Sequence, residues 1–153
     1  MTGLDQRWLL LVVLAFVSGC ERYALDRKME ELCKQDGGVK VYETVTLSSE
    51  EYTRIFGYAI NTKSKEDYYG PDYRYVLTQN VLIGKEADPE KGQGRLTRWY
   101  SAIYRRADGR LLGESVSYGR SGGDGFTFGF HPSVNSCPRL SRGLDQMVFL
   151  KGS

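Results

Sequence analysis

Cys20 is the residue whose position in the chain points most directly to a chemical reaction. It follows the ten apolar residues Trp8–Val17 and the two small residues Ser18 and Gly19. An apolar run of this length is typical of a secretory signal peptide, and it is far shorter than the roughly 20 residues that a membrane-spanning helix needs. We therefore expect residues 1–19 to be removed as a signal peptide.

The four residues Val17-Ser18-Gly19-Cys20 resemble the lipobox of bacterial lipoproteins. The resemblance implies that the Cys20 thiol receives a diacylglycerol group, that a dedicated signal peptidase cuts before it, and that its new amine is acylated, palmitate being one such chain. Two or three chains anchor a protein lastingly, since each buried CH₂ contributes about 0.8 kcal/mol. Glu21 differs from the aspartate that retains lipoproteins in the inner membrane, so an outer-membrane anchor is expected. The alternatives are an ordinary secretory peptide and an uncleaved anchor.

Cys33 and Cys137 are the two cysteines that remain once Cys20 carries lipid. An even pair in a compartment that oxidises thiols is expected to form a disulfide, with two separate thiols as the alternative. A bridge that closes about 100 residues would stabilise the fold by roughly 4–5 kcal/mol in the entropic account. Two distant cysteines and a single histidine do not supply a tetrahedral site, so we expect no metal.

The composition favours one domain over residues 20–153. The lipobox resemblance implies that this domain faces the periplasm. The formal net charge of +2 is small, and the basic clusters have acidic residues close by. Nucleic acid is therefore not an expected partner. Eleven tyrosines indicate a sheet-rich domain with amphipathic surfaces.

His131 is the single histidine of the chain. A hydrolytic triad would need it as the base, with Ser121 or Ser133 as the nucleophile and Asp124 as the acid. The spacing of these residues matches no catalytic motif, and no metal-, phosphate- or dinucleotide-binding motif occurs. A solvent-facing or hydrogen-bonded loop histidine is the simpler interpretation. We expect neither enzymatic activity nor a cofactor.

The segment from Gly119 to His131 is rich in glycine and phenylalanine, and we expect a loop there. Its glycines can leave backbone N–H groups exposed, and Arg120 could bind a carboxylate or a phosphate. Together with Asp124 and His131, this loop is a candidate site for a small ligand or a glycan, or a contact surface for a protein. A structural loop is the alternative.

Hydrophobic periodicity predicts a helix over residues 21–35 with one apolar face, formed by Leu25, Met29, Leu32 and Cys33. Alternation predicts a single strand from Val39 to Leu47, in which Glu43 falls on the apolar side. That carboxylate needs an arginine partner or a bulge in the strand. Ser48 and Glu51 match a capping box at the start of a short helix that ends at Gly57.

Asp108-Gly109 is the strongest hairpin signal in the sequence. A two-residue turn would place Ala107 opposite Arg110 and, farther along, Trp99 opposite Tyr118. Such an aromatic pair stabilises the facing strands and makes the sheet surface around it a second candidate binding surface.

These elements predict an α+β fold, with an amino-terminal helix packed on a mostly antiparallel sheet of about four or five strands and one disulfide. The other expected strands cover residues 73–83, 95–107, 110–119 and 146–150.

Several segments of the chain resemble small uncharacterised lipoproteins of gram-negative bacteria, among them Val39–Val45, Gly113–Arg120 and Cys137-Pro138. The resemblance supports the expected location and carries no known activity. We expect a lipid-anchored envelope protein that acts as a protein-interaction module. The alternatives are a small-ligand or glycan binder that uses the Gly119–His131 loop and, third, a hydrolase.

Overall fold

The computed structural model describes residues 21–61, 66–125 and 131–152 of the 153-residue chain. The expected signal peptide and Cys20 lie outside these residues. Contacts group the chain into two compact units. Unit 1 comprises the described residues up to Gln35, Asn80–Arg98 and Tyr118–Cys137, and unit 2 comprises Asp36–Gln79, Trp99–Ser117 and the residues from Pro138 onward. The expectation of one domain over residues 20–153 stays a prediction.

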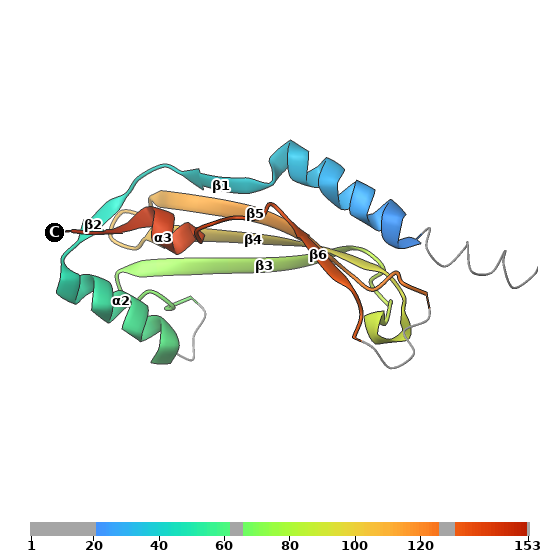
Figure 1. Cartoon of the computed structure of the whole chain (residues 1–153). Coiled ribbons are helices and arrows are strands. Elements are labelled where there is room, and N and C mark those ends of the chain that lie inside the picture. Colours follow the sequence, from blue (N-terminus) through green and yellow to red (C-terminus); the bar gives the residue numbers. More distant parts are fainter. Residues whose placement is uncertain (1–20, 62–65, 126–130, 153) are drawn as a thin grey trace, which may run out of the picture. The chain divides into compact units, whose positions relative to one another are not determined.

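A five-stranded sheet runs in the order β1 (Gly38–Val41), β5 (Leu111–Ser121), β4 (Arg95–Arg105) and β3 (Tyr73–Ile83), and β6 (Val134–Cys137) also pairs with β5 (Figure 1). β1 is antiparallel to residues 113–116 of β5, and β6 is antiparallel to residues 118–121. The predicted α+β class, with an amino-terminal helix and a mostly antiparallel sheet, is confirmed.

In unit 1, residues 21–36 form the expected helix, and Leu25 and Met29 are its buried residues. Gly94 leaves room for the Leu25 side chain, because a Cβ at Gly94 would lie 2.2 Å from Leu25 Cδ1. A disulfide joins Cys33 of this helix to Cys137 of β6, with the Cα atoms 6.1 Å apart. The bridge closes 104 residues, for which the entropic account gives a stabilisation of roughly 4–5 kcal/mol.

The single strand expected from Val39 to Leu47 is wrong, because the chain breaks between β1 and β2 (Val45–Leu47). The N–H groups of both Tyr42 and Glu43 donate to the Leu112 carbonyl, at 2.8 and 3.1 Å, so the extra residue disrupts the ladder. Glu43 there receives hydrogen bonds from Arg105 and Arg110. The arginine partner that its position required is thus confirmed.

The capping box at Ser48 is confirmed. The Ser48 N–H donates to Glu51 Oε2 at 2.9 Å, and the Glu51 N–H donates to Ser48 Oγ at 3.2 Å. The helix that follows, α2 (Ser49–Asn61), runs past the expected end at Gly57. Gly57 has open space around it and does not adopt a positive φ, so it does not act as the left-handed residue that ends a helix.

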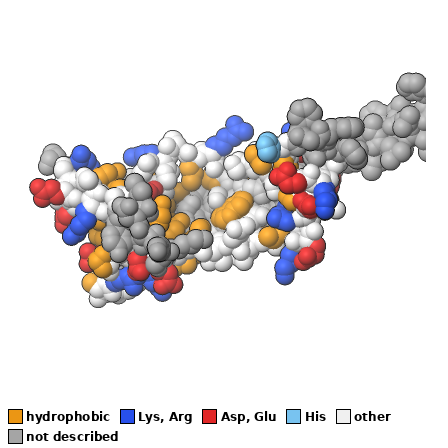
Figure 2. Space-filling model, turned by 90° about the horizontal axis from the view of Figure 1, so that it is seen from below, with side chains coloured by type: hydrophobic (Ala, Val, Ile, Leu, Met, Phe, Trp, Pro, Cys, Tyr) orange, Lys and Arg blue, Asp and Glu red, His pale blue; other side chains and the backbone are white. Residues whose placement is uncertain are grey.

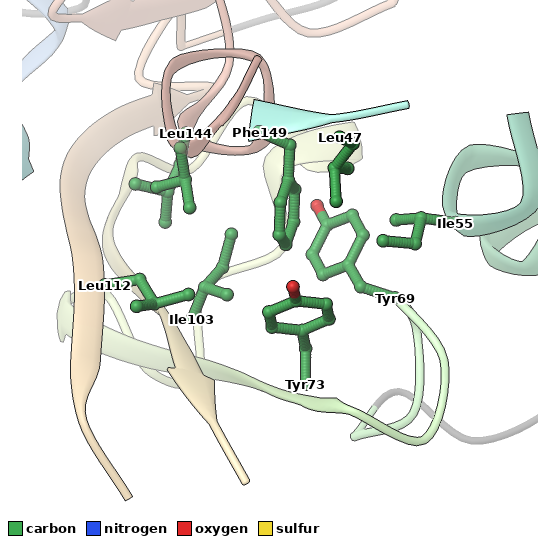
Figure 3. Packing of buried hydrophobic residues seen from close by; sticks show 9 residues of the cluster. Leu47, Ile55, Tyr69, Tyr73, Ile103, Leu112, Leu144 and Phe149 are labelled. Carbon is green, nitrogen blue, oxygen red and sulfur yellow. The ribbon is translucent and has the colours of Figure 1, made fainter. Parts of the chain in front are cut away.

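The core of unit 2 is built around Phe149, whose ring lies among side chains from α2, the sheet and the segment between α2 and β3 (Figure 3). Its centroid is 4.8 Å from that of Tyr73 and 5.4 Å from that of Tyr69. The final strand expected at residues 146–150 is wrong. Residues there form α3 (Leu144–Val148), and only then does β7 (Phe149–Lys151) pair in parallel with β2.

The connection between β4 and β5 differs from the two-residue turn that Asp108-Gly109 predicts. The Arg105 N–H donates to the Arg110 carbonyl, and the Gly109 N–H donates to the Arg105 carbonyl, each at 2.9 Å. Residues 106–109 therefore form a four-residue connection, and Ala107 does not lie opposite Arg110. Asp108 stabilises this wider loop by accepting hydrogen bonds from the Arg110 N–H and from Arg105 Nη1. The predicted pairing of Trp99 with Tyr118 assumed a two-residue turn, and the hydrogen bond between Arg105 and Arg110 shows that this turn is not formed.

None of the helices in residues 21–61, 66–125 and 131–152 is long and apolar enough to cross a membrane.

Candidate functional site

Arg120, a candidate binding residue in the sequence, lies in β5 and is 2% exposed. Its Nε donates to Asp26 Oδ1 at 2.7 Å, and its Nη1 donates to the carbonyls of Gly122 and Ser133 at 2.6 and 2.9 Å. Asn135 of β6 donates to the same Asp26 oxygen at 3.2 Å. Arg120 thus links the helix, β5 and the segment before β6, and its enclosed guanidinium binds the carboxylate of Asp26 within unit 1.

Asp124 belongs to the same network. Its carboxylate accepts from the Ser133 N–H at 2.9 Å and from Ser133 Oγ at 2.6 Å, and Arg22 Nη1 lies 3.4 Å away. Burial raises the pKa of the Asp124 carboxyl, but the hydrogen bonds from Ser133 and the charges of Arg22 and Arg120 outweigh it and leave the pKa below its ordinary value. These contacts stabilise the fold at neutral pH, and that contribution is lost as the pH falls through the lowered pKa.

His131 is exposed and does not connect the acid to a serine. Ser133 Oγ donates directly to Asp124 and accepts from Arg120 Nη1 at 2.7 Å. In the described part of the chain, no hydrogen bond joins His131 to Ser121 or Ser133. The arrangement of a hydrolytic triad, in which the histidine lies between the acid and the nucleophile, is not formed by these residues.

The glycine-rich segment uses its N–H groups in hydrogen bonds within unit 1, as the structural-loop alternative implies. The Gly122 N–H donates to the Ser133 carbonyl at 2.9 Å, and the N–H groups of Gly123 and Gly125 donate to the Gly92 carbonyl at 3.0 and 3.2 Å. A Cβ placed on Gly92 would lie 1.6 Å from the Gly125 carbonyl oxygen. The glycines therefore allow two backbone segments to pack directly on each other.

The second expected surface, around Trp99 and Tyr118, is not an open aromatic face. Tyr118 is only 3% exposed, and its hydroxyl accepts a hydrogen bond from Arg98 Nε at 3.2 Å. Trp99 is partly buried. Neither ring therefore offers the wide exposed surface that the sequence suggested.

Unit 2 carries a polar cluster at its surface that the sequence did not single out. The Glu114 carboxylate accepts from the Tyr42 hydroxyl at 2.7 Å and from the Tyr100 hydroxyl at 3.0 Å. The hydrogen bond to Glu114 raises the pKa of Tyr42, and burial followed by the same kind of bond raises the pKa of Tyr100. Both hydroxyls thus act as hydrogen-bond donors that hold the Glu114 carboxylate in place.

β3 is an edge strand of the five-stranded sheet, a position that its sequence alone does not reveal. It is 11 residues long and ends the strand order, so no other strand of the described chain lies beyond it. Leu77 and Leu82 are each 44% exposed and Ile83 is 42% exposed. Figure 2 shows hydrophobic and uncharged side chains at the centre of the visible face.

The sequence of β3 lacks the features that usually protect a strand edge. Natural edge strands are commonly short or carry lysine, proline or a bulge that prevents further pairing. Residues 75–83 of β3 contain no charged residue and no proline. Among the described residues, the outer edge of β3 is therefore a surface suited to accept another strand.

In the ranges that the structure describes, no group of three or more His, Cys, Asp or Glu side chains is placed to hold a metal ion.

The close packing of the glycines predicts that Gly92→Ala unfolds at much lower urea concentration than the wild-type chain. Gly109→Ala is the matched control, since both glycines have positive φ (82° and 70°) but only Gly92 has a backbone atom in the way of a Cβ. The control should lose only the roughly 1–2 kcal/mol of a left-handed residue. Equal losses for the two variants would show that the Gly92–Gly125 contact does not constrain unit 1.

No protein-family model, curated protein or solved structure matches the chain. Among the described residues, the outer edge of β3 is the feature that points most directly to a function.

Proposed function

We propose that this chain is a lipid-anchored protein of the cell envelope that binds another protein by strand addition along β3. The observation that carries the proposal is the outer edge of β3, which is uncharged over residues 75–83 and has no neighbouring strand in the described chain. Strand addition gives affinity through main-chain hydrogen bonds and specificity through alternate side chains. Leu77, Leu82 and Ile83 supply exposed apolar side chains for such specificity.

The lipid anchor in this proposal is supported by two features. Val17-Ser18-Gly19-Cys20 matches the lipobox at all four positions, with Glu21 favouring the outer membrane over the inner. The Cys33–Cys137 disulfide fits an oxidising compartment such as the periplasm. Glu21, the residue after Cys20, is already helical, so a lipid on Cys20 would be attached next to the helix of unit 1.

Cys20→Ala should abolish incorporation of labelled palmitate and leave an unprocessed precursor, because no thiol remains to accept the lipid. Ser18→Ala is the control, since it keeps a small residue within the motif and should be labelled like the wild-type chain. Unchanged labelling of Cys20→Ala would refute the anchor.

A photo-crosslinking amino acid in place of Thr78, an exposed residue of β3, should give a covalent adduct in intact cells because the partner strand lies beside it. The same amino acid in place of Thr53, an exposed residue of α2, is the control and should give none. The products are separated by size and identified by mass spectrometry. Absence of an adduct at position 78, or equal adducts at both positions, would overturn the role of β3.

A further inference from the structure

The middle of β3 has a hydropathy pattern that reads the same in both directions. Val76–Leu82 has the sequence Val-Leu-Thr-Gln-Asn-Val-Leu, with Gln79 at its centre. Two aliphatic residues lie at each end, and three polar residues lie between them. In an antiparallel pair centred on Gln79, each residue would lie opposite one of its own character.

The backbone of β3 directs the peptide group of Gln79 outward. The Asp72 carbonyl accepts from the N–H of Arg106, the residue after β4, whereas the Tyr75 N–H donates to the Glu66 carbonyl. Peptide groups of successive residues in a regular strand point to opposite edges. Even-numbered residues of β3 thus bond toward β4, and the odd-numbered residues Leu77, Gln79 and Val81 present their N–H and C=O groups on the outer edge.

We propose that the partner strand is β3 of a second copy of this chain, paired antiparallel about Gln79. This inference rests on the proposed function, because it names the partner that the β3 edge binds. Gln79 lies opposite Gln79 of the second copy, Leu77 lies opposite Val81, and Thr78 lies opposite Asn80. Leu77, Gln79 and Val81 exchange main-chain hydrogen bonds with the facing strand, and the aliphatic pairs flank a polar centre.

The chemistry of β3 favours a second copy over an unrelated strand. A two-fold axis through Gln79 makes the interface isologous, so each patch must complement itself, which the palindromic order of Val76–Leu82 satisfies. Self-pairing of a charged edge would place like charges opposite each other, and this segment has none. Pairing one strand buries little surface, but anchoring both copies on one membrane raises their effective concentration.

The Glu66 carbonyl sets one limit of the pairing. It already accepts from the outward N–H of Tyr75, so the chain's own segment covers the edge there and the second strand begins beyond it. This contact leaves β3 open from Val76 onward. A pairing centred on Gln79 therefore extends from Val76 to Leu82.

The register is tested by cysteine substitution in the full chain, expressed in cells and analysed on a non-reducing gel. Gln79→Cys should give a covalent dimer, because the facing Cα atoms of such a pair are about 5.5 Å apart. Asn80→Cys alone should give little, since position 80 faces position 78 of the other copy, and co-expression with Thr78→Cys should produce the mixed dimer. Equal dimer from Gln79→Cys and Asn80→Cys would overturn the register.

A second test does not depend on thiols. Chains with Gln79→Lys and chains with Gln79→Glu, expressed together and treated with a carbodiimide, should form an amide-linked mixed dimer through position 79. Gln146→Lys with Gln146→Glu, at an exposed position of α3, is the matched control and should form none. If neither test gives a dimer while the Thr78 crosslinker captures a different protein, the second copy is refuted and the role of β3 stands. If Thr78 also captures nothing, both are refuted.

Discussion

In the described residues, one edge of the five-stranded sheet is the 11-residue strand β3, and the opposite edge is divided between the 4-residue strands β1 and β6. β1 and β6 both pair with β5, each along part of its length, whereas β3 ends the strand order with its outer peptide groups facing away from β4. Residues 76–83 of β3 carry no charged side chain, so another strand can pair with their outward peptide groups. The proposed function follows from this constraint.

The residues of unit 1 that looked most like a ligand site serve instead to hold its segments together. A buried guanidinium is stable only when its N–H groups are satisfied, and Arg120 meets this need with Asp26, Ser133 and Gly122. The disulfide joins the helix to β6 a few residues away from these contacts. Charge and covalent chemistry thus fix the position of β6 on β5, so neither group is left to recognise a partner.

Local patterns in the sequence predicted local structure well. Helical periodicity predicted the apolar face of the helix at residues 21–36, and the spacing of Ser48 and Glu51 predicted the capping box. The position of Glu43 on the apolar side of its segment indicated that it needs an arginine partner. The Cys33–Cys137 bridge followed from cysteine number and the expected compartment. The failures were also local in part. Asp108 accepts hydrogen bonds that stabilise a four-residue connection, which the Asp-Gly pair alone does not distinguish from a two-residue turn.

The features that depend on strand order could not be read from the sequence. The residue types of Arg120 and its neighbouring glycines are typical of an exposed loop. They are enclosed because β6 pairs with β5 beside Arg120 and because the Gly92 backbone packs on the glycines. β3 has the composition of an ordinary strand, and its importance comes from its place at the end of the strand order in the described residues. The palindromic order about Gln79 was present in the sequence, but it has meaning only for an edge strand.

Residue-resolved amide hydrogen exchange of the full chain, measured as a function of protein concentration, tests the β3 edge most directly. At low concentration the outward N–H groups of Leu77, Gln79 and Val81 should exchange rapidly, while those of Thr78 and Asn80, bonded toward β4, are protected. At high concentration the three outward groups should also become protected as two copies pair. Equal protection of all five N–H groups at every concentration would contradict the account, because it would mean that the outer edge is never open.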